Sequence, residues 1–230
     1  MSKVLVIADT QAPFIHRDYL KFLKSVQKKY STRITVHVGD LVDHHALGDW
    51  DHDPDGFSAG HELKEAIEQL KPYYKAFPHL KVCKGNHDER IFRRAMKHGI
   101  PRAYLREYRD FLQAPKGWKF VDKFEVDNVV YKHGLGYSGQ NGAINAAKDE
   151  LKSCVIGHLH SDAGVLFWAN AQVLLFGMNV GSGIDKDSYA FEYGKHMRKK
   201  PILGCGVVID GIPLFIPMIL NKKGRWVGTL

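Results

Sequence analysis

The sequence contains little cysteine and no long apolar run, and each absence excludes a class of protein. The three cysteines, Cys83, Cys154 and Cys205, are odd in number, and each lies in an apolar stretch. They are predicted to be buried, reduced thiols, which excludes a disulfide framework and a cysteine-rich zinc site. No apolar stretch approaches the ~18 residues that a membrane-spanning helix needs. The chain opens on a strand-like run without the layout of a signal peptide, so we expect a cytoplasmic protein with no membrane partner.

Acidic residues are outnumbered by basic ones. The chain has 25 Asp and Glu against 33 Lys and Arg, for a formal net charge of +8. This sign favours polyanionic partners, such as nucleic acid, nucleotides or phosphorylated molecules. Internal repeats, low-complexity tracts and flexible linkers are also missing, so residues 1–230 are expected to form a single domain. The oligomeric state does not follow from the sequence.

Five short polar clusters organise the rest of the chain, and each follows an apolar run. The runs are short and rich in Val and Ile, which is typical of buried strands. The clusters are Asp9-Thr10-Gln11, Gly39–Asp43, Gly85–Asp88, His133-Gly134 and Gly157–His160. Because sites in open α/β sheets form beyond the carboxyl ends of the strands, we expect all five at one edge.

Apolar residues at helical spacing predict helices between these strands. The first runs from about Asp18 to Lys29, with Asp18 as its N-cap, and it makes the first two strands a parallel β-α-β unit. A second keeps an apolar face from Leu63 to Tyr74. Others are expected at about Glu89–Lys97, at about Arg102–Gln113 and in a short segment that ends near Lys152.

Strands are also predicted in the second half of the chain, which is expected to be mostly strand from Cys154 onward. Trp118–Val126 and Val129–Lys132 flank Asp127-Asn128, which is a hairpin signal. Three later apolar runs, Ala171–Phe176, Ile202–Ile209 and Leu214–Leu220, are expected to complete a second sheet packed on the first. The predicted fold class is therefore α/β, with two sheets.

The clusters contain the side chains that a pair of divalent metal ions needs. Two ions about 3.5–4 Å apart can activate water and clamp a phosphate ester, and one carboxylate must bridge them. Asp40 is the natural bridge. Asp9, Gln11 and one His could complete one ion, and Asn86 with two further His residues could complete the other.

The set resembles the calcineurin-like metallophosphoesterase superfamily. Its pattern is Asp-x-His, Gly-Asp-x-x-Asp, Gly-Asn-His-Asp/Glu, a lone His and Gly-His-x-His, and the resemblance covers the chain from Asp9 to His160. Asn179-Val180-Gly181-Ser182 extends it. The resemblance implies two β-sheets sandwiched between helices (α/β/β/α) and a hydrolase acting on phosphate ester bonds.

The resemblance also implies ligands and catalytic roles. Each ion would have four ligands, and Asp40 would be common to both. The first ion would be held by Asp9, Gln11, Asp40 and His160. The second would be held by Asp40, Asn86, His133 and His158. His87 would touch the phosphate and protonate the leaving oxygen, Asp88 would orient His87, and Asp43 would support the turn or a ligand.

Gln11 departs from the pattern, because most members have His there. An amide oxygen is a neutral, harder and weaker ligand than imidazole, so the first ion would bind loosely, prefer Mn²⁺, or bind only with substrate. Two divalent ions are expected, with Mn²⁺ first and Fe, Zn or Ni as alternatives. His44-His45 after Asp43, in place of Arg-Gly, argues against the phosphoprotein phosphatase branch.

Three functions remain open at this point. The first is hydrolysis of phosphodiester bonds in nucleic acid or nucleotides by a metal-bridging hydroxide. Arg90 and Arg94, with Arg93 and Lys97, could share one helix face and bind the phosphate backbone, although a solvated helix face is an equal alternative. The second is a phosphomonoesterase or a nucleoside-diphosphate-type phosphatase or diphosphatase. The third is a non-catalytic scaffold with a decayed metal site.

Overall fold

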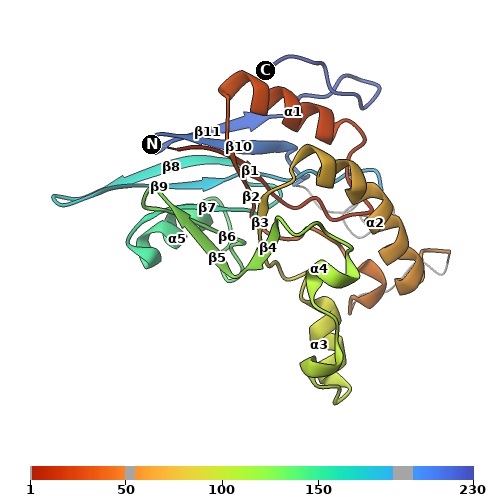
Figure 1. The fold of residues 1–230 in the computed structure, drawn as a ribbon. Helices are drawn as coiled ribbons and strands as arrows, with labels where there is room; N and C mark the ends of the chain where they lie inside the picture. The colour runs from red at the N-terminus through yellow and green to blue at the C-terminus, as the bar shows by residue number, and fades with distance from the viewer. Residues whose placement is uncertain (1, 50–54, 189–198) are drawn as a thin grey trace.

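The computed structural model describes residues 2–49, 55–188 and 199–230. Two β-sheets lie face to face, and helices cover their outer surfaces (Figure 1). This confirms the predicted class of two sheets flanked by helices. That the chain forms a single domain stays a prediction. In the described residues, no helix has the length and apolarity to cross a membrane.

The first sheet has six strands. In spatial order they are β11 (Ile212–Pro217), β10 (Gly204–Ile209), β1 (Lys3–Ile7), β2 (Ile34–His37), β3 (Leu80–Cys83) and β4 (Trp118–Val121). The strands β1 to β4 are parallel, with Val4 opposite Ile34 and Leu80 opposite Trp118. β10 pairs antiparallel with β1 and with β11. The predicted parallel β-α-β unit is confirmed.

The second sheet has five strands. In spatial order they are β5 (Lys123–Val126), β6 (Val129–Lys132), β7 (Ser153–Ile156), β9 (Leu174–Asn179) and β8 (Gly164–Ala169). β5 and β6 form the predicted hairpin, and Asp127 and Asn128 adopt the positive φ angles of a two-residue turn. β6, β7 and β9 run parallel, so β6 and β7 present their carboxyl ends on the same side.

The helices connect the strands. In the described residues they are α1 (Tyr19–Tyr30), α2 (Ala59–Ala76), α3 (Arg90–Lys97), α4 (Tyr108–Phe111) and α5 (Gly142–Glu150), with 3₁₀ turns at His45–Leu47 and Arg102–Tyr104. α3 projects away from the two sheets in Figure 1.

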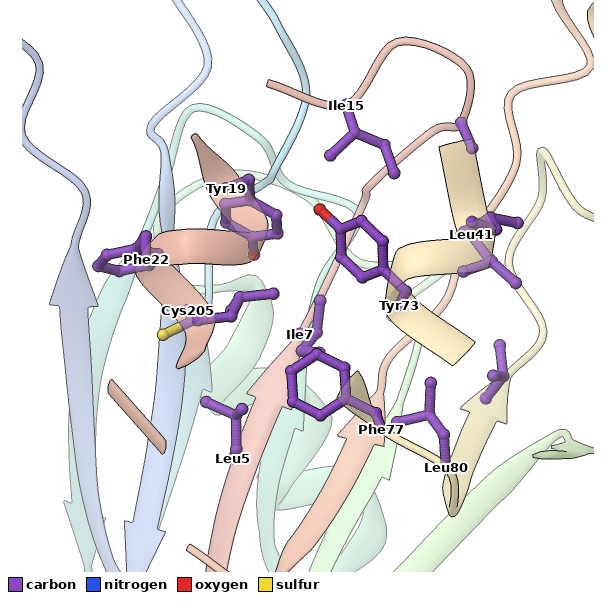
Figure 2. Close-up of a cluster of buried hydrophobic side chains, with 14 of the residues drawn as sticks. Leu5, Ile7, Ile15, Tyr19, Phe22, Leu41, Tyr73, Phe77, Leu80 and Cys205 are labelled. Carbon is purple, nitrogen blue, oxygen red and sulfur yellow. The ribbon is translucent and has the colours of Figure 1, made fainter. Parts of the chain in front are cut away.

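The alternation of side chains along β1 explains how both faces of the first sheet are buried. Leu5 and Ile7 point to the core under α1 and α2, whereas Val4 and Val6 point into the core between the sheets. Figure 2 shows the first of these cores, where Tyr19 and Phe22 of α1 lie over the sheet together with Tyr73 and Phe77. The three cysteines are free and buried, as predicted.

One expectation about the last third of the chain was wrong, and one strand was not predicted. β10 and β11 join the first sheet beside β1 and do not complete the second. An apolar run identifies a strand but not its partner, because pairing depends on contacts between residues that are distant in the sequence. β8 was missed because this edge strand leaves Leu166 and Phe167 exposed and lacks a clear alternation.

Two helix predictions also need correction. The segment expected as one helix at Arg102–Gln113 is a 3₁₀ turn followed by the single turn α4, because only isolated residues such as Tyr108 and Leu112 reach the core. Asp18 stands at the N-cap of α1 without capping it. Its carboxylate is instead bound by Arg225 and by the N–H of Trp226.

Candidate metal centre

Five strands, three from the first sheet and two from the second, carry the polar clusters at their carboxyl ends. Asp9 and Gln11 follow β1, Asp40 follows β2, and Asn86 follows β3. His133 follows β6, and the loop with His158 and His160 follows β7. The two sheets therefore both contribute residues to a common edge, whereas the sequence predicted only that the five clusters meet at one edge.

The first group of potential ligands consists of Asp9, Asp40 and His160. Each offers one ligand atom, and these atoms lie within 4.8 Å of one another. His160 Nε2 is 3.0 Å from Asp9 Oδ1. The carboxylate of Asp9 also accepts the N–H of His158, at 2.9 Å for Oδ2, which ties the β7 loop to the end of β1.

The second group consists of Asp40, His133 and His158, at the same mutual spacing. His133 Nδ1 donates to the carbonyl of Val38 at 3.0 Å, so Nε2 is the nitrogen that can act as a ligand. Nε2 lies 3.3 Å from Asp40 Oδ2 and 2.9 Å from Asn86 Oδ1. Asp40 belongs to both groups, so its carboxylate could contact an ion in either one.

Gln11 provides a test of whether a cation fits the first group. Its side chain is buried, and Nε2 lies 3.4 Å from His160 Nε2. Its Oε1 is buried and has no hydrogen-bond partner among the described residues. A buried amide oxygen without a partner costs free energy, which a bound cation would recover. The residues present therefore fit a metal ion.

Four of the predicted ligands have a strained backbone. The φ angles are 47° for Asp9, 46° for Gln11, 53° for Asp40 and 67° for His158. Residues other than glycine rarely adopt this left-handed region, and each case costs about 1–3 kcal/mol. Such strain gathers at functional sites, where the surrounding structure holds side chains in positions that relaxed backbone would not give.

Glycines let the clusters approach one another. A Cβ atom on Gly85 would lie 2.1 Å from Asp40 Oδ1, and one on Gly157 would lie 2.3 Å from Asp9 Oδ2. Both distances are far shorter than any side chain tolerates. Gly85 and Gly157 are therefore needed for close packing against a carboxylate.

The buried charged groups of the site shift the pKa values of one another. Burial lowers the pKa of His133, but the carboxylate of Asp40 outweighs burial and raises that pKa to about 10. Burial likewise opposes ionisation of Asp40, yet His133 and His87 hold its pKa below the ordinary value. A metal ion would take the place of the proton on His133, since metal binding at imidazole releases a proton.

His87 lies beside both groups and is oriented by Asp43. Its Nδ1 is 2.6 Å from Asp43 Oδ1, and its Nε2 is 3.9 Å from Asp40 Oδ2. Arg90 donates to Asp43 Oδ1 at 3.0 Å, and its second terminal nitrogen is 3.2 Å from His87 Nε2. Burial lowers the pKa of His87, but Asp40 and Asp43 outweigh burial and hold it above the ordinary value.

The prediction that Asp88 orients His87 was therefore wrong. The carboxylate of Asp88 accepts the N–H groups of Val42 at 3.1 Å and Gly85 at 2.9 Å. It joins the second and third clusters through their backbones. Asp43, which the sequence indicated only as a support, is the residue that contacts the imidazole.

Arg94 does not point to the metal groups. It donates to the carbonyls of Leu47 and Gly48 and forms an ion pair with Asp49 at 3.0 Å. Arg90 does lie beside His87. The four cations of α3 therefore do not act as one free stripe, because Arg93 also donates to the carbonyl of Asn86 and Lys97 pairs with Asp49, so each of the four binds the chain itself.

Three supporting residues were not assigned a structural role from the sequence. Thr10 Oγ1 donates to the carbonyl of Leu41 and lies 2.9 Å from Nε2 of buried His37, so these side chains join the ends of β1 and β2. Asn179 Nδ2 donates to the carbonyls of Leu159 and Asp162, which holds the His158–His160 loop. A polar His within the β2 run was the available signal for the first pair.

Comparisons with known proteins identify the family of this chain. The calcineurin-like phosphoesterase family model matches residues 2–176. The Gene 54 proteins of Mycobacterium phages D29 and L5 are each 26% identical over 219 residues, which cover 79% of this chain and 80% of theirs.

Solved structures that this chain is similar to include Vps29 of Chaetomium thermophilum, with 12% identity, a TM-score of 0.49, and coverage of 98% of this chain and 92% of its own. The phosphoesterase Yfce of E. coli has 12% identity, a TM-score of 0.43, and coverage of 98% and 97%. The family model matches well over half of the chain, and it decides the assignment. The chain belongs to the calcineurin-like phosphoesterase family and is a metal-dependent hydrolase of phosphate esters.

Proposed function

We propose that this protein hydrolyses phosphodiester bonds of nucleic acid or nucleotides at a centre of two divalent metal ions. The observation that carries the proposal is the position of Asp40 in both groups of potential ligands. Asp9, Gln11 and His160 complete the proposed first ion site. Asn86, His133 and His158 complete the second.

The proposed ions are Mn²⁺. Oxygen donors from Gln11, Asn86 and the carboxylates suit a harder ion than a site made only of imidazole or thiolate would. When bound, the ions neutralise charge on the phosphoryl oxygens and lower the pKa of the attacking water.

His87 is the proposed proton donor to the leaving oxygen. Asp43 holds Nδ1, so Nε2 is the atom that faces the metal groups. The raised pKa keeps the imidazole protonated at higher pH than an ordinary His, as a general acid requires. Arg90 lies next to Nε2 and is the proposed contact for a phosphoryl oxygen.

A diester substrate is favoured by the formal net charge of +8, which attracts polyanions. The second candidate is hydrolysis of a phosphomonoester or of a small nucleoside-diphosphate-type compound. The binding of Arg94 to the loop at Leu47 and Gly48 favours this candidate, because it removes a cation from the surface that would track a polymer.

The test compares an aryl phosphodiester with the matching aryl phosphomonoester. Metal-stripped protein is supplied with Mn²⁺, and elemental analysis counts the ions bound per chain. Two ions per chain with diester hydrolysis that a chelator abolishes is the expected result. A clear monoester preference would select the second candidate.

The His87→Ala variant tests the assigned proton donor. It is expected to keep both ions and to lose about 10²- to 10⁴-fold in kcat, because general acid catalysis contributes that much. Undiminished turnover by His87→Ala would remove His87 from the mechanism. Two bound ions without turnover of either ester by the wild type would favour the scaffold alternative.

A further inference from the structure

A ridge of four cations runs along the outer surface of α1. Lys21, Lys24 and Lys28 lie on the helix, and Arg17 precedes its first residue by two positions. The spacings of four, three and four residues place side chains on one helix face, and they span about 16 Å. All four side chains are exposed.

The opposite face of α1 is buried in the core. Tyr19, Phe22, Leu23 and Val26 are buried, and Figure 2 shows Tyr19 and Phe22 against the first sheet. The helix therefore cannot turn an apolar face toward a membrane or a partner helix. What it offers to solvent is positive charge.

The charge of the ridge is not neutralised within the protein. The helix sequence from Tyr19 to Tyr30 contains no Asp or Glu. In residues 2–49, 55–188 and 199–230, none of the four cations of the ridge forms an ion pair with a carboxylate. In α3, by contrast, Arg90 pairs with Asp43 and Arg94 pairs with Asp49.

The same face borders a hollow in the surface. A depression of about 540 Å³ is lined by Arg17, Leu20, Lys21, Lys24, Ser25 and Lys28. A phosphate group in this depression would lie among several cations of the ridge.

Two further lysines lie near the N-terminal end of the ridge, which is the end closer to the metal groups. The turn that carries Lys222 and Lys223 is held at the N-terminal end of α1, where His16 binds the carbonyl of Gly224 and Asp18 binds Arg225. Because α1 runs back against β1, this end lies toward the strand ends that carry the metal groups.

We propose that the cationic ridge of α1 is a docking surface for the phosphate backbone of a nucleic acid. The inference names a polymer as the substrate class, and in that respect it rests on the proposed function. Regularly spaced, unpaired cations on a rigid helix match a repeating polyanion and do not read bases, so binding is independent of sequence.

The test measures binding of a short fluorescent DNA duplex by Mn²⁺-loaded protein. The His87→Ala background prevents cleavage during titration. The ridge variant is Lys21→Gln/Lys24→Gln/Lys28→Gln. The matched control is Lys64→Gln/Lys71→Gln/Lys75→Gln, which removes three exposed charges from neighbouring α2, where Glu65 and Glu68 are interspersed.

The ridge variant is expected to bind about 10-fold or more weakly at low salt, and its plot of log affinity against log salt should be about 2 to 3 units shallower. The α2 control should retain the affinity and slope of the parent. Circular dichroism confirms that both variants are folded.

Two results would overturn the proposal. One is an equal loss in the ridge variant and the α2 control, or no loss in either. The other is ridge-dependent binding to vesicles of anionic lipid with no binding to DNA. Wild-type hydrolysis of the small aryl diester is measured in parallel, and its absence would count against the proposed function alone, because the binding measurement does not depend on turnover.

Discussion

The carboxylate of Asp43 and the imidazole of His87 form a partly buried hydrogen-bonded pair, with Oδ1 and Nδ1 2.6 Å apart. The two residues come from the ends of β2 and β3, so the pair exists only in the folded chain. Its effect is to fix which imidazole nitrogen faces the metal groups and to favour the protonated ring.

Replacement of Asp43 by Asn should separate orientation from charge. The amide retains the shape of the side chain but not the negative charge that raises the pKa of His87. Because the protonated ring is the form that donates, a lower pKa moves the alkaline limb of the kcat profile to lower pH. We expect kcat at neutral pH to fall by about 10- to 100-fold, within the range of general acid catalysis. Steady-state kinetics across pH would measure the shift of this limb. Elemental analysis would check that both ions remain bound.

The Asp88→Asn variant is the matched control for this prediction. Asp88 contacts backbone N–H groups of Val42 and Gly85 and not the imidazole. Loss of one buried acceptor should cost about 1–3 kcal/mol in the free energy of unfolding. The pH limb of kcat should stay in place. If the limb moved with Asp88→Asn and not with Asp43→Asn, the assignment of the pair would be wrong.

The clusters that hold the candidate ligands could be located from the sequence because each cluster comes just after a buried strand. A short apolar run ending in Asp, Asn or His specifies both the element and the point at which the side chain leaves it. Parallel strands then bring their carboxyl ends together without further information, as they do for Asp9 and Asp40.

The contacts that were predicted wrongly are those of His87 and Asp18. In both, the true partner lies far away in the sequence, and its position depends on the folded structure. Asp88 follows His87 directly, yet Asp43 reaches the ring from another strand. Asp18 occupies an N-cap position, but Arg225 from the far end of the chain binds it. In each case a partner distant in the sequence replaced the local interaction that the sequence predicted.

Gln11 should control the affinity of one ion and not of both. Gln11→Ala removes the amide oxygen that has no other partner, and the first ion should bind about 10-fold or more weakly. Gln11→His should bind more tightly and shift preference from Mn²⁺ toward Zn²⁺, because imidazole is the softer ligand. Titration calorimetry with each metal would measure both effects. Equal weakening of the two ions by Gln11→Ala would contradict the assignment of Gln11 to a single site.

The Asp18–Arg225 pair should make stability depend on pH in the acid range. The hydrogen bonds that Arg225 donates to Asp18 hold the pKa of its carboxyl group well below the ordinary value. The carboxylate therefore stabilises the folded state above about pH 4, and this contribution is lost as pH falls further. Asp18→Asn should be less stable than the wild type at neutral pH, and the difference should shrink in acid. Urea unfolding at several pH values would measure it, and Arg225→Gln should reproduce the same trend if the pair is responsible.

Gly85 should be intolerant of the smallest possible side chain. In Gly85→Ala the new Cβ would lie 2.1 Å from Asp40 Oδ1 and 2.3 Å from the Asp40 backbone nitrogen, so the carboxylate shared by both metal groups must move. We expect a loss of about 1–3 kcal/mol in the free energy of unfolding and at least about 10-fold weaker Mn²⁺ binding. Gly60→Ala is the control, because Gly60 lies in α2 with nothing within 4 Å of its added Cβ, and Ala should stabilise the helix by about 0.5–1 kcal/mol. Chemical denaturation and metal titration would distinguish the two, and a Gly85→Ala protein that binds both ions as the wild type does would show that Asp40 is not confined by the third cluster.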